Sequence, residues 1–230
     1  MTLAELRDLM KDYELMLDNY KGAPTDAQRN AQINWAYRTL AAEVSMFDPK
    51  VVFNLTSGKA VYDLRSTTDF GKRMLQVYRV VIGGTLLRRT DGYPGLWTMD
   101  ELERHVPDWR TAAGNTPTKA VQYSSTSLLL HPTPTSAGSD NFVAGTVLPD
   151  DLVNDTDEPE LPVELHEAVA LEAVLKAATP SLSDQAQLLP LQTMLQQYKP
   201  LIADLRRTNR RLATGGEGDM GHAYRDWIIL

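Results

Sequence analysis

The chain has 230 residues, a net charge of −7 and no cysteine. The acidic balance argues against attraction of the whole protein to nucleic acid or to anionic membranes, although it leaves room for local basic patches. Without cysteine there are no disulfides and no thiolate chemistry, and any metal would need histidine and carboxylate ligands. Neither a secretory signal nor an apolar run of roughly 20 residues, the length that spans a bilayer, is present, and we expect a soluble protein.

Two amphipathic helices are predicted at the start of the chain. Residues 2–5 (TLAE) and 25–28 (TDAQ) are capping boxes, in which a hydroxyl caps the first turn and a Glu or Gln side chain reaches back. Apolar residues at helical spacing follow each box. Pro24 and Pro49 end the two helices, because proline cannot supply an amide to the next turn. With a short turn between them, we expect an antiparallel pair.

A β-rich region begins at Val51. The runs VVFNLT and AVYDL flank residues 57–59 (SGK), and MLQVYRVVI and TLLRRT flank the glycines at 83 and 84. Both are predicted as hairpins. A short helix is predicted from Met99 and is ended by Pro107. The runs AVQYSSTSLLLH and NFVAGTVLP are then predicted as strands around the turn at residues 132–138.

Helical spacing returns near the C-terminus. Apolar residues from Leu165 to Ala178 predict one helix, and those from Leu188 to Leu212 predict a last helix that begins near Ser183. Because the apolar phase continues across the proline at 200, we predict one kinked helix there and not two.

The predicted fold class is mainly α with a β-rich insertion (α+β). Residues 1–49 and 160–213 share the helical apolar period and are expected to form one antiparallel helical bundle. Residues 50–159 are expected to be inserted between them as β hairpins with one short helix. Residues 214–230 begin with a glycine-rich stretch and are expected to form a flexible, extended C-terminal arm.

No catalytic or cofactor motif is found in the sequence. Residues 70–72 (FGK) lack the second glycine and the Ser/Thr of a phosphate-binding loop. No two histidines are four residues apart on one helix, and no Gly-x-Ser-x-Gly elbow is present. These searches therefore predict no catalytic residue, no cofactor and no metal.

The stretch NDTDEPELPVELHEAV, residues 154–169, holds six carboxylates and one histidine. Pro162 suits the first position of a helix, where its missing amide costs nothing. Glu164 would then lie in the first turn, and the acids before it would lie at the positive end of that helix. The start of a helix accounts for these acids without a metal ion.

A metal-assisted hydrolase is the rival interpretation of the same stretch. It would use Glu164, His166 and Glu167 with Asp155 or Asp157. Consecutive residues of a helix point about 100° apart, so His166 and Glu167 cannot both face one ion without help.

Four arginines near the end of the last predicted helix form the sharpest charge feature. Arg206 and Arg210, and Arg207 and Arg211, are four residues apart, so the two pairs share one side of the helix. The cations either complement the helix dipole or form a docking face for an acidic partner or a phosphate backbone, and the sequence leaves both interpretations open.

The apolar C-terminal end follows the glycine-rich tether and includes Tyr224, Trp227, Ile228, Ile229 and Leu230. Such an end either folds back onto its own core or reaches a neighbouring subunit, and we favour the second interpretation.

Taken in order, several segments resemble the adaptor (head–tail connector) proteins of tailed bacteriophages, which form a ring beneath the portal. The segments are NAQINWAYRTLAAEV, WTMDELERHVPDWR, GNTPTKAVQY, LLLHPTPTSAG, VLPDDLV and DTDEPELPVELHEAVALEAVLKA, within residues 30–178. The most specific pieces are the turn with Pro132 and Pro134 and the acidic segment before the helix. The final helix and the tail are similar only in layout.

The resemblance implies a structural virion protein of the neck that is not an enzyme and is assembled in the host bacterial cytoplasm. It implies a ring of copies of this chain, expected to be a dodecamer, that binds the portal on one side and tail or further connector proteins on the other. Genomic DNA would pass through without specific binding, no membrane would be involved, and the arm at residues 224–230 would insert against the portal. A tail-completion or baseplate protein is the structural alternative.

Overall fold

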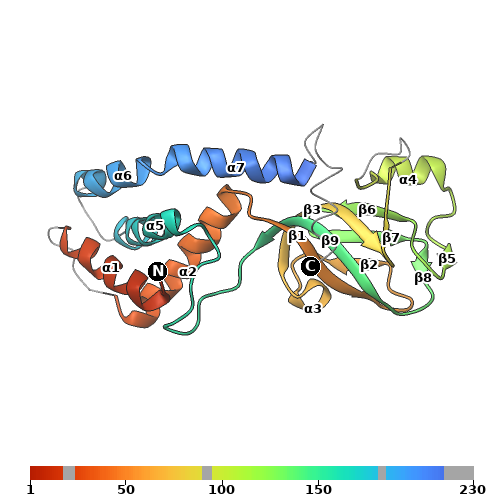
Figure 1. Ribbon diagram of the computed structural model, residues 1–230, viewed down its shortest axis with the longest axis horizontal. Coiled ribbons are helices and arrows are strands. Elements are labelled where there is room, and N and C mark those ends of the chain that lie inside the picture. Colours follow the sequence, from red (N-terminus) through yellow and green to blue (C-terminus); the bar gives the residue numbers. More distant parts are fainter. Residues whose placement is uncertain (18–23, 90–94, 181–184, 215–230) are drawn as a thin grey trace. The chain divides into compact units, whose positions relative to one another are not determined.

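The computed structural model describes residues 1–17, 24–89, 95–180 and 185–214 (Figure 1). The chain divides into two compact units. One unit comprises Met1–Met46 with Pro149–Arg207, and the other comprises Phe47–Leu148 with Thr208–Leu230. Helices and mainly antiparallel sheets occur in one chain, which confirms the mixed α+β class.

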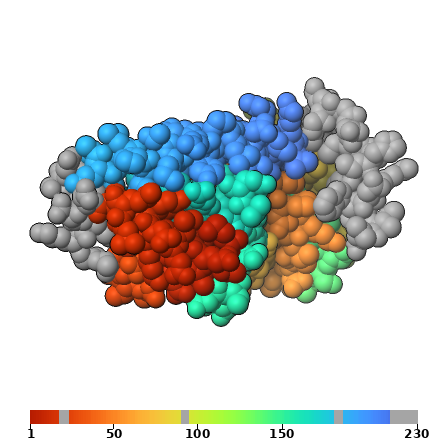
Figure 2. Space-filling view, turned by 60° about the vertical axis from the view of Figure 1, so that its left-hand side comes forward, coloured from red at the N-terminus to blue at the C-terminus, as the bar shows by residue number. Residues whose placement is uncertain are grey.

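The first unit is helical. It contains α1 (Leu3–Leu15), α2 (Asp26–Glu43), α5 (His166–Ala178), α6 (Leu189–Gln196) and the first part of α7 (Lys199–Thr214). These helices share one apolar core, and its fully buried side chains include Leu6, Met10, Ile33, Tyr37, Leu171, Val174 and Leu191. In the space-filling view, α1 (red) and α6 with the start of α7 (blue) form part of one exposed face of this unit (Figure 2).

Both predicted capping boxes are confirmed. The Thr2 hydroxyl accepts a hydrogen bond from the Glu5 amide at 3.3 Å, and the Glu5 carboxylate accepts one from the Thr2 amide at 2.8 Å. Thr25 and Gln28 repeat this exchange at the start of α2. Each box satisfies amides that have no partner within the helix, so these two starts are determined by local sequence.

The second unit contains two main sheets. The first has the strand order β1 (Phe47–Leu55), β9 (Gly138–Leu148), β3 (Arg73–Ile82) and β4 (Thr85–Leu86). The second has the order β2 (Val61–Asp63), β7 (Ser127–His131) and β6 (Lys119–Ser124). Short elements complete the unit, namely α3 (Thr67–Phe70), α4 (Met99–His105) and a parallel pair of β5 (Ala113–Gly114) and β8 (Thr133–Pro134).

The predicted strands are largely present, but their pairing was predicted correctly in only one place. The hairpin at the glycines 83 and 84 is confirmed, since β3 pairs with β4 there. The hairpin at residues 57–59 is wrong, because β1 pairs with β9 and β2 pairs with β7. The run AVQYSSTSLLLH is not one strand but the hairpin β6–β7, which turns at Ser125.

The last predicted helix is divided into two helices, so the prediction of a single kinked helix is wrong. A 3₁₀ turn (Gln185–Leu188) leads into α6, and Gln197 and Tyr198 separate α6 from α7. Pro200 is the second residue of α7, where its missing amide removes no intrahelical bond. Among the described residues, no helix is both long enough and apolar enough to cross a membrane.

Candidate partner-binding site

The exposed side of α7 carries the four predicted arginines. Arg206, Arg207, Arg210 and Arg211 are all exposed, whereas Ile202 of the same helix is buried in the apolar core. The Arg207 guanidinium lies 3.2 Å from the Asp204 carboxylate, and both side chains are more than 60% exposed. An ion pair this exposed contributes little to stability, so it leaves the Arg207 guanidinium accessible to solvent.

A carboxylate on α5 holds the start of α7 in place. Glu167 accepts a hydrogen bond from the Tyr198 hydroxyl at 2.5 Å and another from the Tyr13 hydroxyl at 2.5 Å. The two hydroxyls donate to the charged form of Glu167 and hold its pKa below the ordinary value. Burial and then the bond to Glu167 raise the pKa of Tyr198 from 10.0 to about 12. One carboxylate thus links α1, α5 and the turn before α7.

Tyr198→Phe should destabilise the helical unit by about 1.5–3 kcal/mol at neutral pH, because it removes a hydrogen bond to a charged group. The pKa of Tyr198 is raised on folding, so its contribution is complete below pH 10.0 and is lost as the pH rises through about 12. Urea denaturation at neutral and strongly alkaline pH measures both effects.

The difference in the free energy of unfolding between wild type and Tyr198→Phe should therefore become smaller as the pH rises. Tyr123→Phe is the matched control, since Tyr123 is 49% exposed, and it should leave stability unchanged at both pH values. A Tyr198→Phe effect of the same size at neutral and alkaline pH would contradict the assignment.

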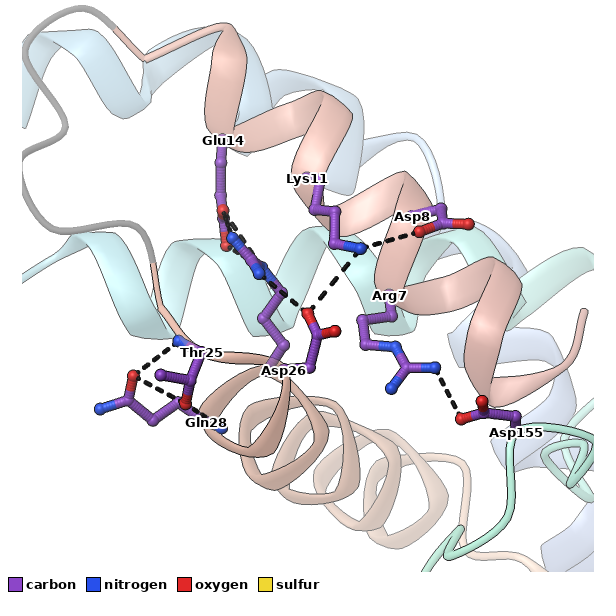
Figure 3. Close-up of polar contacts among 9 residues, drawn as sticks. Arg7, Asp8, Lys11, Glu14, Thr25, Asp26, Gln28 and Asp155 are labelled. Carbon is purple, nitrogen blue, oxygen red and sulfur yellow. Dashed lines mark hydrogen bonds and ion pairs between the residues drawn. The ribbon is translucent and has the colours of Figure 1, made fainter.

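The segment that joins β9 to α5, residues 149–162, is here called the acidic connection. It contains six carboxylates and no basic residue. The carbonyls of Asp157 and Asp155 accept hydrogen bonds from the first amides of α1, at Leu3 (2.8 Å) and Ala4 (3.2 Å). The Asp155 carboxylate also pairs with Arg7 of α1 at 2.6 Å (Figure 3). The acidic connection therefore caps α1.

Two residues of α2 fix the acidic connection from its other side. The Asn34 amide donates to the Leu152 carbonyl at 2.9 Å, and its oxygen accepts from the Leu152 amide at 2.7 Å. The Tyr37 hydroxyl accepts from the Glu160 amide at 2.7 Å, and burial raises the pKa of Tyr37 to about 12. The acidic connection thus has a defined backbone path although it is neither helix nor strand.

The prediction that these acids introduce α5 needs correction. Pro162 is the residue before a 3₁₀ turn (Val163–Leu165), and α5 begins only at His166. Asp157 accepts hydrogen bonds from the Val153 and Asn154 amides, which lower its pKa and close the loop on itself. The acids at 155 and 157 therefore lie at the N-terminus of α1, a contact between distant parts of the sequence.

The residues of the rival hydrolase site hold structural contacts. The buried His166 ring donates from Nε2 to the Leu161 carbonyl at 2.9 Å, and its Nδ1 lies 2.8 Å from the Met1 nitrogen. Glu167 binds the two tyrosine hydroxyls, and Glu164 lies in the 3₁₀ turn. In the part of the chain that the structure describes, no group of three His, Asp or Glu side chains is placed to hold a metal ion.

The predicted arm residues Tyr224, Trp227, Ile228, Ile229 and Leu230 lie outside the described residues. Sequence reasoning treated Tyr13 and Tyr198 only as apolar positions and did not find their bonds to Glu167. The one signal in the sequence was the residue type, because a tyrosine hydroxyl usually has a hydrogen-bond partner when the side chain is buried.

The comparison with known protein families bears on these surfaces. The model of the SU10 adaptor protein family matches residues 1–218. No curated protein matches the chain. The match extends beyond the segments on which the resemblance to phage adaptors was based, and it confirms that resemblance. The chain belongs to the SU10 adaptor protein family, a family of phage head–tail adaptors.

Proposed function

We propose that the protein forms an oligomeric ring in the neck of the virion, joins the portal to the tail and lines the passage for DNA. The family match over residues 1–218 carries this proposal, because the family consists of structural phage adaptors. A head–tail adaptor must contact one protein on its head side and another on its tail side. In a closed ring every copy presents the same surface to the head side and the same second surface to the tail side. A dodecamer is the expected ring.

Charge supports the proposed passage for DNA. The chain has a net charge of −7, so its summed field repels phosphate groups. Genomic DNA would then pass during ejection without specific binding. Assembly would take place in the host bacterial cytoplasm, before the portal is joined to the tail.

The proposed partner-binding residues fall in two groups. One is the arginine side of α7, formed by Arg206, Arg207, Arg210 and Arg211. The other is the apolar end of the C-terminal arm, formed by Tyr224, Trp227, Ile228, Ile229 and Leu230. An apolar segment on a glycine-rich tether can dock on a partner without disturbing the fold of the chain that carries it.

Deleting residues 219–230 should abolish binding to the portal and leave the rest of the chain folded. Binding of the truncated chain to purified portal rings of the same phage measures the first effect, and circular dichroism with thermal unfolding measures the second. Trp227→Ser with Ile228→Ser, at unchanged length, should weaken binding in the same direction because the apolar contact is lost. Docking of the truncated chain at full strength would contradict the role of the arm.

A further inference from the structure

An apolar row crosses the first sheet of the second unit, here called the β unit, from edge to edge. Val52 of β1 faces Phe142 of β9 in the strand register. Phe142 also faces Val81 of β3, which in turn faces Leu86 of β4. Facing residues place their side chains on the same side of a sheet, so the four form one continuous row, here called the outer row. Val52 is 55% exposed, Phe142 and Leu86 are half-buried, and Val81 is buried.

The outer row lies on the side of this sheet that points away from the second sheet. Side chains alternate between the two sides of a strand, so Val51 and Phe53 point the other way from Val52. Both are buried, and the Phe53 ring lies 5.6 Å from the ring of Tyr62 in the second sheet. The outer row is therefore outside the core that the two sheets share. Apolar surface that is contiguous, unlike scattered single residues, is typical of a docking site.

The last helix ends beside the outer row. Arg79 lies two residues before Val81 on β3, so both side chains are on the outer side of the sheet. The Arg79 guanidinium donates a hydrogen bond to the carbonyl of the buried Ala213 at 3.4 Å. Both residues belong to the β unit. The end of α7 therefore reaches the outer side, and the C-terminal arm follows directly after it.

We propose that, before the protein meets its partner, the apolar end of the C-terminal arm covers the outer row of its own chain. This end contains Tyr224, Trp227, Ile228, Ile229 and Leu230. Contact between them removes two apolar surfaces from water, which favours the docked state. The portal then competes with the outer row for the same segment. The competition rests on the proposed function, whereas the contact itself does not.

The length of the arm suits this contact. Ten residues lead from Thr214 to Tyr224, and four of the residues 215–223 are glycines. A glycine-rich chain of ten residues has a root-mean-square length of about 17 Å. The outer row crosses four strands, which lie about 4.8 Å apart, so it extends over about 14 Å. The apolar end can therefore reach the row of its own chain without any change in the fold.

The charge of the arm also suits the outer row. Residues 215–230 carry three carboxylates and one arginine. The exposed Lys50 lies beside the row, with its ammonium nitrogen 5.9 Å from the centre of the Phe142 ring. Among the described residues, Lys50 forms no ion pair, so its charge is available to a carboxylate of the arm. The contact thus combines apolar packing with opposite charge.

An engineered disulfide tests the contact, because the chain has no cysteine of its own. Val52→Cys is combined in turn with Trp227→Cys, Ile228→Cys or Ile229→Cys, and the isolated full-length chain is oxidised mildly. At least one pair should form a disulfide within one chain, since docking holds the two positions within reach. Mass spectrometry of proteolytic fragments identifies the bond. A denaturing gel without reductant shows whether it lies within one chain or between two.

Val61→Cys, with the same three arm cysteines, is the matched control. Val61 is also a valine of an edge strand and is 42% exposed. Its neighbour Tyr62 packs on Phe53, so Val61 points away from the first sheet. The fastest pair with Val61→Cys should form about tenfold more slowly than the fastest with Val52→Cys, because its effective concentration is lower. Equal rates would overturn the contact. Disulfides mainly between two chains would overturn docking within one chain and assign the outer row to the arm of a second copy.

Val52→Asp tests the competition with the portal. A carboxylate in the outer row disfavours burial under an apolar segment, and the exposed position lets the chain keep its fold, which circular dichroism checks. With the arm released, the apparent affinity for purified portal rings should rise by about threefold or more, whereas Val61→Asp should bind like wild type. Unchanged or weaker binding of Val52→Asp would overturn the competition. An own-chain disulfide in a protein that binds no portal would contradict the proposed function and support the contact.

Discussion

Gly145→Ala should destabilise the β unit by about 3 kcal/mol or more and separate β3 from β9. A Cβ atom at this position would lie 2.1 Å from the Gln76 carbonyl oxygen and 2.6 Å from the Met74 methyl carbon. The oxygen belongs to the backbone of β3, next to irregularities in the pairing at Met74 to Gln76 and Val77 to Arg79. It cannot move aside without breaking the pairing. Because β9 lies between β1 and β3, the loss would spread through the sheet.

Gly138→Ala is the matched control on the same strand. Its Cβ atom would meet Leu55 at 3.7 Å, an ordinary contact, so the free energy of unfolding should change by less than about 1 kcal/mol. Urea denaturation gives the stability of both variants, and hydrogen exchange at the amides of β3 and β9 shows where the structure opens. Equal stabilities for the two variants would contradict the close approach at Gly145.

Arg29→Ala should destabilise the helical unit by about 3–5 kcal/mol. The Arg29 guanidinium binds Glu14 through Nη2 at 2.7 Å and Nε at 3.1 Å, and it binds Asp26 through Nη1 at 3.1 Å. The side chains of Arg29 and Glu14 are only 9% and 7% exposed, whereas Asp26 is more than half exposed. Removing the arginine would leave the Glu14 carboxylate buried without a counter-charge, which accounts for the size of the effect.

Two controls separate burial from charge pairing. Lys11→Ala removes exposed pairs with Asp8 at 3.0 Å and Asp26 at 3.8 Å but leaves the Arg29–Glu14 pair in place. Because the lysine side chain is 40% exposed, the change should cost no more than about 1 kcal/mol. Replacing both members, with Glu14→Leu and Arg29→Met, should recover much of the loss, because no charge is then left buried. Thermal unfolding of the three variants makes the comparison. An Arg29→Ala loss no larger than that of Lys11→Ala would contradict a desolvated pair.

The local features of the helical unit were predictable from sequence. Thr2 and Thr25 start their helices through residues three positions ahead, so each signal lies within a few residues of its effect. The short helix from Met99 was predicted with its end at Pro107, but its capping box at Thr98 and Glu101 was missed. The spacing Thr-x-x-Glu was present there and could have identified it.

The pairing of strands was not predictable in the same way. The glycine at position 58 correctly marks a turn, with a positive φ of 76°. A turn fixes where a strand ends but not which strand lies beside it. The neighbour of β1 is β9, and Phe47 faces Thr146 across the pair. Such pairing depends on burial over the whole sheet, which no short window of sequence contains.

The sequence placed the arginines of the last helix correctly, but it assigned the acids of the 154–169 stretch to the wrong helix. The arginines at 206 and 210 were placed on one side of a helix by spacing alone, and the structure describes them as exposed on α7. The acids at 155 and 157 were placed at the wrong helix, because their contacts are with α1 at the other end of the chain. Sequence order favoured the adjacent helix, whereas the fold brings the first helix to them.

The most direct test of the proposed function is a cryo-electron microscopy reconstruction of the neck of the virion. The account predicts a closed ring of copies of this chain directly beneath the portal, with the DNA passage through its centre. Finding the chain at the baseplate, or as single copies outside a ring, would contradict the central claim.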